Sequence, residues 1–540
     1  MLDSIVYKNP LLRKKIEQLR DENLPSLSGS SRSITAGEGA VESVATIKVE
    51  AGDRHIAADK GIEALRSAGV TFLQRSGKLV RIAPIKAKTS EGEEFLIPGI
   101  VPVTPPILER ALGNAATWQR YDGRSKKNVR IDPPRAIAAQ ILDMVGEWSF
   151  PPLNGIIQCP TLRRNGSLLD SEGYDDATGL VLVSNVKLEP IADQPSRKDA
   201  ERALALLTAL LVEFPFANEA SRSVALSMLM TPVLRAAMTV APLHLATAPT
   251  AGTGKSYLAD CASMIASGDR CAVEAASPNA EETEKRLVGA ALNGYPVIAL
   301  DNCSETLQSD LLCQVTERPL MMLRALGKSD KYRIPNAFTC FANGNNIAVA
   351  ADLVRRTIRC AMDANSERPE SREFTTNPLA AISQARGQYV AAILTIARAY
   401  VMAGRPNPLK PLASFEEWSL LIREPLAWLD CADPVATMDS LRQTDPNAIE
   451  RQTVFETWKS EIGVGRERAC LTAELVSATD SRPALREALL TIAAQRFGDK
   501  IDPKALGKWL SKNENTLAAK CKLLVDHTNA ARPRWYLEAA

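Results

Sequence analysis

A Gly-Lys-Ser tripeptide at residues 254–256 follows an apolar run and a loop of small residues, a combination that can bind phosphate. The apolar run Leu243–Ala248 predicts a buried strand, and a helix is expected to start at Tyr257. Glycines between a strand and a helix let backbone N–H groups converge on phosphate oxygens. The segment is therefore typical of a Walker A phosphate loop, although Pro249 stands where that pattern has its first glycine.

In such a loop Lys255 would reach the β and γ phosphates of ATP, and the Ser256 hydroxyl would bind Mg²⁺. An ordinary glycine-rich turn is the alternative interpretation, and the motifs further along the chain argue against it. The predicted nucleotide-binding residues are Thr250, Ala251, Gly252, Thr253, Gly254, Lys255, Ser256 and Tyr257.

A second apolar run, residues 296–300, ends at Asp301, as a Walker B strand must. The Asp301 carboxylate would hold the Mg²⁺ ion. Many such ATPases have a glutamate base directly after this aspartate, whereas this chain has Asn302. The group that acts on the attacking water is left open between Asn302, which could orient it, and the carboxylates of Glu281, Glu282 and Glu305.

A third apolar run, residues 337–342, ends at Asn343. A polar residue at that strand end is expected to lie between the two Walker elements, where it can sense the γ-phosphate or align the attacking water. Further on, Arg355 and Arg356 close a short predicted helix before another strand. An arginine finger would project from there onto a neighbouring subunit's nucleotide, and a solvated helix end is the alternative.

With these elements in order, residues 199–363 resemble the AAA+-like ATPase core of superfamily III helicases, in particular the helicase and primase-helicase proteins of prophages, plasmids and genomic islands. The strings that carry the resemblance are APTAGTGKS, VIALDN, RALGKSD, FANGNN, DLVRRTIRCAMD and ERPESREF. PTLRRNGSLL and GYDDATGL resemble the region that precedes the ATPase in the same group, and IDPKALGKWLSKN with RWYLE resembles its winged helix. No constellation of carboxylates suited to nucleotide polymerisation is found in the sequence.

The resemblance implies a ring-shaped homo-oligomer, with a hexamer favoured, that hydrolyses ATP with Mg²⁺ and acts on single-stranded or forked DNA. The sequence between the second and third motif strands predicts a hairpin around the turn at residues 327–330, carrying Lys328, Lys331 and Arg333. In the ring helicases that the sequence resembles, a hairpin at this position enters the central channel. Its cations would bind the phosphate backbone of DNA, although a solvated surface turn is the alternative.

A second predicted DNA contact lies near the C-terminus. Residues 500–540 contain eight basic and four acidic residues, a net charge of +4 where the whole chain carries +2. Lys504, Lys508 and Lys512 recur at helical spacing and would face a phosphate backbone. Winged helices also bind proteins, which leaves that alternative open.

The predicted fold is α/β: a P-loop NTPase domain of AAA+-like type, with helices on both faces of a parallel sheet, a mixed α+β region before it and a winged helix after it. The expected boundaries are 1–50 for a tail and flexible linker, 51–195 for the α+β region, 196–400 for the ATPase domain, 401–495 for a helical region or lid, and 496–540 for the winged helix. The chain has 540 residues, enough for several domains.

Composition excludes several classes of protein. Ten scattered cysteines without a CxxC pair, and only three histidines, argue against a zinc site, a disulfide scaffold and a Ser-His triad. The sequence predicts neither a signal peptide nor a membrane span, so the reducing cytoplasm is the expected compartment. The predicted function is an ATP-dependent DNA helicase or translocase in replication of a mobile element. The alternatives are a AAA+ remodelling or loading ATPase that does not unwind DNA, and a nucleotide sensor that does not hydrolyse ATP.

Overall fold

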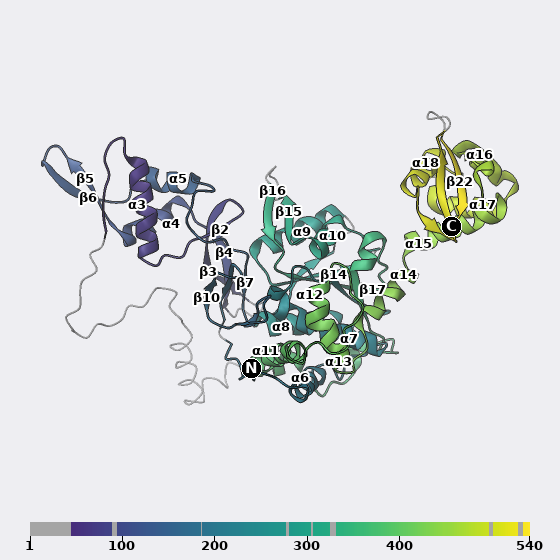
Figure 1. Ribbon diagram of the computed structural model, residues 1–540, viewed down its shortest axis with the longest axis horizontal. Helices are drawn as coiled ribbons and strands as arrows, with labels where there is room; N and C mark the ends of the chain where they lie inside the picture. The colour runs from purple at the N-terminus through teal and green to yellow at the C-terminus, as the bar shows by residue number, and fades with distance from the viewer. Residues whose placement is uncertain are drawn as a thin grey trace. The chain divides into compact units, whose positions relative to one another are not determined.

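The computed structural model describes residues 45–540 except 89–93, 185, 277–279, 304–305, 325–330, 496–499 and 528–532. The chain forms two compact units, Met1–Ile82 with Val101–Pro152 and Ala83–Ile100 with Leu153–Ala540 (Figure 1). The long strands β3 (Lys78–Lys88) and β4 (Glu94–Pro102) carry the chain from one unit to the other, and β3 pairs with β2 (Leu73–Arg75). Most of the predicted N-terminal tail lies outside the described residues.

The first unit packs three helices and a small sheet around one core. The helices are α3 (Arg54–Ser67), α4 (Pro105–Ala115) and α5 (Arg135–Asp143). Its sheet has β1 (Thr46–Lys48) parallel to β5 (Thr117–Asp122), and β5 forms a hairpin with β6 (Lys127–Ile131). Each helix buries one apolar face, as Leu108 and Leu112 of α4 illustrate, and Trp118 of β5 is fully buried among these helices.

The second unit is built on a five-stranded sheet in the order β13-β14-β17-β12-β18, with all neighbouring strands parallel. The strands are β12 (Leu243–Ala248), β13 (Ala272–Ala275), β14 (Val297–Cys303), β17 (Thr339–Asn345) and β18 (Thr357–Ala361). All six residues of β12 are buried, because both faces of a parallel sheet are covered.

Helices cover both faces of this sheet. Val297, Ala299 and Phe341 join the core of one face, whereas Ile298 and Leu300 join the other. On the first face lie α6 (Arg197–Ala209), α7 (Glu219–Leu234), α8 (Lys255–Ser267) and α11 (Pro378–Met402). On the second lie α9 (Ala280–Asn293) and α10 (Asp310–Glu317), as Figure 1 shows. The predicted α/β class with a parallel sheet is confirmed.

The predicted pairing of the two strands before the Asn343 strand is also confirmed, while the predicted turn at residues 327–330 lies outside the described residues. β15 (Leu320–Arg324) pairs antiparallel with β16 (Lys331–Pro335), from Leu320 opposite Pro335 to Arg324 opposite Lys331. Met321 and Ile334 face the core, whereas Leu320 and Met322 are 45% and 46% exposed. The hairpin thus presents one face to solvent.

Short elements complete the second unit. Before the sheet come β7 (Gly155–Ile157), β8 (Thr161–Leu162), β9 (Leu168–Leu169), β10 (Gly173–Asp175) and β11 (Leu180–Leu182). After it come α12 (Glu416–Trp418), α13 (Glu424–Trp428) and α14 (Thr437–Gln443). In the described part of the chain, no helix combines the length and the apolar character that crossing a membrane requires.

The C-terminal elements share a separate core that runs from Val454 to Leu537, so residues on both sides of position 495 pack together. The helices are α15 (Pro446–Glu461), α16 (Thr472–Ala478), α17 (Pro483–Ala493) and α18 (Pro503–Lys512). The sheet has the order β19-β22-β21-β20, from Cys470–Leu471, Arg534–Ala539, Cys521–Asp526 and Leu517–Ala518.

Candidate functional site

The Gly-Lys-Ser loop joins the carboxyl end of β12 to the N-terminus of α8, which begins at Lys255, two residues before the predicted start. Gly252 and Gly254 adopt φ angles of 75° and 94°, in the left-handed region that favours glycine. A Cβ at Gly252 would lie 2.9 Å from an oxygen of Glu370, and one at Gly254 would lie 3.3 Å from the Phe214 ring. Glycine is therefore favoured at both positions, because the backbone is left-handed there and a Cβ would lie too close to neighbouring atoms.

Lys255 lies inside this loop and is only 8% exposed. Its Nζ donates hydrogen bonds to Thr250 O (3.1 Å), Thr253 Oγ1 (3.2 Å) and Asn345 Oδ1 (2.9 Å). Burial lowers the pKa of Lys255, and the charge of Asp301 opposes that shift. All three acceptors are uncharged, so phosphate oxygens could replace them and offer the ammonium group a stronger, charged partner.

Side chains from three different elements meet beside the loop. Ser256 Oγ of α8 donates to Asp301 Oδ1 of β14 at 3.1 Å, and Asn343 Nδ2 of β17 lies 3.4 Å from the same Ser256 oxygen. β17 runs between β12 and β14, so Asn343 is located between the two predicted Walker elements. One hydroxyl and one carboxylate suit Mg²⁺, which keeps several waters and takes its other ligands from phosphates.

Asn302 has an unusual backbone. Its φ of 55° lies in the left-handed region, at an irregularity of β14 between Leu300 and Cys303. Asparagine tolerates this conformation better than most residues. The Asn302 N–H donates to Asp301 Oδ1 (3.0 Å) and Asn343 Oδ1 (3.3 Å). The Asn302 side chain is exposed beside the acidic residue, where it can contact a water molecule.

The carboxylates considered for activating water have other partners or lie outside the described residues. Glu281 pairs with Lys285 at 2.9 Å, and Glu282 lies 3.4 Å from Arg286, both within α9. Glu305 is not among the described residues.

A cavity of about 530 Å³ opens next to the loop. It is lined by Leu210, Glu213, Phe214, Gly252, Thr253, Gly254, Tyr257, Arg372, Phe374, Thr375, Thr376, Asn377 and Pro378. The Phe374 ring is 55% exposed, and the Arg372 guanidinium lies 5.2 Å from its centre. A cavity of this size, with two phenylalanines among polar and charged side chains, can accept a small molecule.

The wall of this cavity is held by one carboxylate. Glu213 accepts hydrogen bonds from the N–H groups of Thr375 (2.8 Å) and Thr376 (3.1 Å) and from their hydroxyls (2.7 and 2.6 Å). These bonds lower the pKa of Glu213 to about 2, so it is ionised at any physiological pH. Sequence reasoning missed Glu213, Phe214, Arg372 and Phe374. The string ERPESREF flagged the right segment without assigning a role to any of its residues.

The two predicted finger arginines have different surroundings. Both close η2 (Ala351–Arg356) before the edge strand β18. The Arg356 side chain is 2% exposed and pairs with Asp352 (2.7 Å) and Glu317 (3.0 Å), which holds it inside its own chain. The Arg355 side chain is 52% exposed and contacts Asp352. Of the two, Arg355 has the accessible guanidinium.

The predicted DNA-binding residues lie on other elements than the Gly-Lys-Ser loop: the hairpin of β15 and β16 and the helix α18. Lys328 lies outside the described residues, and Lys331 pairs with Arg324 at the open end of the hairpin ladder. Arg333 is exposed, with its Nε 3.3 Å from Met322 Sδ. Lys504, Lys508 and Lys512 are exposed along one face of α18.

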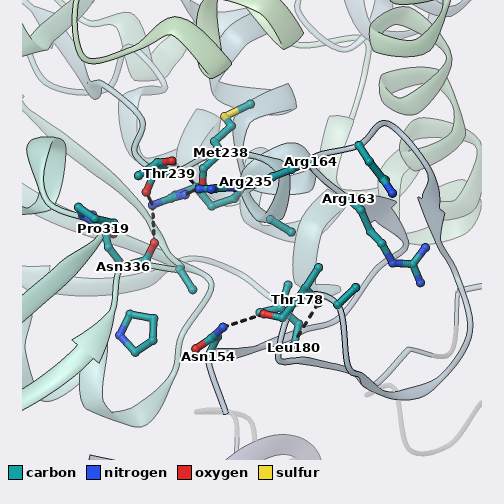
Figure 2. Close-up of a pocket in the computed structure, with 15 residues that line it drawn as sticks. Asn154, Arg163, Arg164, Thr178, Leu180, Arg235, Met238, Thr239, Pro319 and Asn336 are labelled. Atoms are coloured by element: carbon teal, nitrogen blue, oxygen red, sulfur yellow. Dashed lines mark hydrogen bonds between the residues drawn. The ribbon is translucent and has the colours of Figure 1, made fainter. Parts of the chain in front are cut away.

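A second cavity, of about 490 Å³, lies at the base of the β15–β16 hairpin (Figure 2). Figure 2 shows Arg235 reaching toward Asn336; its guanidinium donates to the carbonyls of Asn336 (2.6 Å), Phe338 (2.9 Å), Met238 (2.6 Å) and Thr239 (3.2 Å). Burial lowers the pKa of Arg235 to about 10, which still leaves it charged. Arg235 therefore fixes the short link between the hairpin and β17.

The other two arginines of this cavity also have protein acceptors. Arg163 donates to Asp175 (2.7 Å) and to Leu168 O (2.6 Å). Arg164 contacts the Thr239 hydroxyl and lies 3.7 Å from Glu417. The arginines that line this cavity therefore form hydrogen bonds and ion pairs with other groups of the protein.

No protein-family model and no curated protein matches the chain. Among solved structures, it is similar to the apo A form of the NrS-1 C-terminal region, with 13% identity, a TM-score of 0.32, and coverage of 81% of this chain and 100% of that chain. A second structure of that region gives 12% identity and a TM-score of 0.33. A ligand-bound JCV helicase gives 14% identity and a TM-score of 0.20, covering 49% of this chain and 72% of that chain.

Proposed function

We propose that this chain is an ATP-dependent DNA helicase or translocase of the AAA+-like superfamily III type. In this proposal a ring-shaped oligomer hydrolyses ATP at its subunit interfaces and acts in replication of a mobile genetic element. The observation that carries it is the meeting of Lys255, Ser256, Asp301 and Asn343 at the carboxyl edge of one parallel sheet. Phosphoryl transfer to water needs these group types close together.

Each residue then has a distinct role in hydrolysis. The loop N–H groups and the Lys255 ammonium bind the β and γ phosphates and stabilise the charge that develops there. Ser256 and Asp301 would hold Mg²⁺, which when bound neutralises phosphate charge. The Asn343 amide, fixed between β12 and β14, orients the attacking water, with the exposed Asn302 amide beside it. A carboxylate base is not part of this scheme.

We assign the cavity beside the loop to the nucleoside half of ATP, because it adjoins Gly252, Gly254 and Tyr257. Phe374→Ala is expected to raise the KM for ATP about tenfold with kcat nearly unchanged, since stacking on a base contributes about 1–3 kcal/mol. The ring is 55% exposed, so its loss should leave the unfolding midpoint unchanged. Steady-state kinetics check this, with Phe374→Tyr as the control that keeps the ring. An unchanged KM in the alanine variant would contradict the assignment.

The hairpin is the proposed coupling element between ATP and DNA. Only residues 336–338 separate β16 from β17, the strand that carries Asn343, and Arg235 fixes this link through two of its carbonyls. In this proposal a change at the carboxyl end of β17 on hydrolysis is passed along β17 and through this link to the hairpin. Cations at its tip would hold the DNA backbone without reading bases.

Lys328→Ala combined with Lys331→Ala is expected to abolish stimulation of hydrolysis by single-stranded DNA while basal hydrolysis persists. Let K be the binding constant for single-stranded DNA. Two lost phosphate contacts should also reduce the slope of log K against log salt by about 1.4, from about 0.7 per contact. A matched double variant at two exposed lysines elsewhere, Lys410→Ala with Lys459→Ala, should change neither quantity. Unchanged DNA stimulation in the hairpin variant would contradict its role as the DNA contact.

We further propose a winged helix for the C-terminal elements from α15 onward, which extends the expected 496–540. β19 pairs with β22, and β22 forms a hairpin with β21 after α18. Lys504, Lys508 and Lys512 lie on the helix before that hairpin, the position of a recognition helix. Strand displacement on forked DNA with ATP tests the function as a whole. Hydrolysis without displacement would favour the remodelling or loading ATPase, and binding without turnover the nucleotide sensor.

A further inference from the structure

The β5–β6 hairpin of the first unit concentrates positive charge. Residues 119–130 carry five basic side chains and one acidic one, a net +4 within a chain whose total is +2. The five basic residues are all exposed; they are Arg120, Arg124, Lys126, Lys127 and Arg130. Such a local field attracts polyanions even where the whole protein is nearly neutral.

The one acidic residue is occupied by the turn. Asp122 Oδ1 accepts from the Arg124 N–H at 3.2 Å, and Asp122 Oδ2 accepts from the Ser125 N–H at 3.1 Å. Hydrogen bonds from Ser125 and then Arg124 hold the pKa of Asp122 below its ordinary value. Among the described residues, none of the five basic side chains forms an ion pair that would neutralise it.

The hairpin is anchored at one end and unpacked at the other. Trp118, opposite Ile131, is 1% exposed and donates through Nε1 to Leu112 O at 3.0 Å. Beyond that pair the ladder continues to Asp122 opposite Lys127, and every residue from 120 to 130 except Asp122 is exposed. Figure 1 shows the two strands extending outward from the helices of their own unit. The buried base holds the charged end in a defined orientation.

One aromatic side chain stands among these cations. Tyr121 is 61% exposed and lies opposite Asn128 in the ladder. Arg130, opposite Gln119, is two pairs away on the same face, and Arg120 precedes Tyr121 on the other face. Aromatic rings beside cations bind single-stranded nucleic acids, because the cations hold phosphates and the ring stacks on a base. Membrane insertion would need a larger apolar surface than Tyr121 and Val129 provide.

We propose that the β5–β6 hairpin is a second binding site for single-stranded nucleic acid, with Arg124, Lys126 and Lys127 on phosphates and Tyr121 stacked on a base. This inference goes beyond the proposed ATPase and does not depend on it, because binding here needs no nucleotide. In this proposal the first unit binds the nucleic-acid strand, and the second unit carries the proposed phosphate loop.

The test measures binding of a labelled single-stranded DNA to the full chain without nucleotide, over a range of salt. Arg124→Gln, Lys126→Gln and Lys127→Gln together should lower the slope of log K against log salt by about 2, from about 0.7 per lost contact. Tyr121→Ala should weaken binding about tenfold at every salt concentration without changing the slope. The matched control removes three exposed basic residues of α3 in the same unit, Arg54→Gln, Lys60→Gln and Arg66→Gln, and should change neither quantity.

The unfolding midpoint of each variant is measured alongside, and all are expected to match the parent because the replaced side chains are exposed. An unchanged slope in the hairpin variant, or an equal loss in the α3 control, would overturn the inference. The inference would also be overturned if the hairpin variant lost binding to phosphatidylserine vesicles while its binding of single-stranded DNA stayed intact. Failure of the proposed ATPase is a separate result, since it would appear as absent hydrolysis in the parent protein.

Discussion

Lys255→Ala is expected to abolish ATP hydrolysis and leave the fold intact. The Lys255 ammonium lies within the phosphate loop, and its acceptors are two loop groups and the Asn345 amide, none of them charged. Removal of this cation takes away the charge that stabilises the transferring phosphoryl group, a change that lowers turnover by about 10²–10³ or more. Measuring phosphate release together with the circular dichroism spectrum and the unfolding midpoint checks both halves of the expectation.

Asp301→Ala should give the same loss through Mg²⁺, because Asp301 and Ser256 are the proposed oxygen ligands. Lys410→Ala, at an exposed lysine, serves as the control and should retain parental turnover. Near-normal hydrolysis in either the Lys255 or the Asp301 variant would mean that the site is wrongly assigned. An unfolded Lys255 variant would instead indicate a structural role for its three hydrogen bonds.

Local sequence was sufficient to predict the strand, glycine turn and helix around Lys255 and the strands that carry Asp301 and Asn343. An unbroken apolar run such as Leu243–Ala248 must be covered on both faces, and glycines after it allow a tight turn into a helix. The hairpin of β15 and β16 was also predictable, because alternating apolar residues flank a turn-forming segment. The location of Asn343 between the two predicted Walker strands was expected from the Walker pattern, since sheet order is not encoded in any single strand.

Contacts between distant segments were not predictable. Glu213 and the loop that donates hydrogen bonds to it, at Thr375 and Thr376, are about 160 residues apart, and a glutamate in a turn after a helix carries no signal for those partners. Arg355 and Arg356 are neighbours of the same type, so spacing could not separate them. What separates them is packing: Glu317 of α10 and Asp352 draw Arg356 into the interior and leave Arg355 outside.

That separation makes Arg355 the proposed residue in trans. Thr357, two residues after Arg355, pairs with Leu243 at the amino end of β12, whereas the phosphate loop follows the carboxyl end of the same strand. Five steps of about 3.3 Å put these ends roughly 16 Å apart, which is farther than an arginine side chain extends. Arg355 therefore cannot reach its own subunit's phosphates and would act on those of a neighbour.

Arg355→Ala is expected to reduce turnover by about 10³–10⁵ without lowering the unfolding midpoint, because its guanidinium is exposed and arginine fingers contribute that much elsewhere. Arg356→Ala is the informative contrast. It leaves Glu317 without its buried partner, so it should lower the unfolding midpoint. Phosphate release and thermal unfolding, measured on both variants, separate a catalytic from a structural arginine.

Mixing inactive subunits tests the trans assignment directly. A subunit with Lys255→Ala still offers Arg355 to its neighbour, and one with Arg355→Ala still has an intact phosphate loop. In an equal, random mixture about a quarter of the interfaces would combine the two intact halves, so hydrolysis should return to a measurable fraction of the parental rate. Recovery should rise and fall with the mixing ratio and be absent when both changes are in one chain. With co-assembly verified by light scattering, a mixture that stays inactive at all ratios would exclude Arg355 as the residue that completes a neighbour's site.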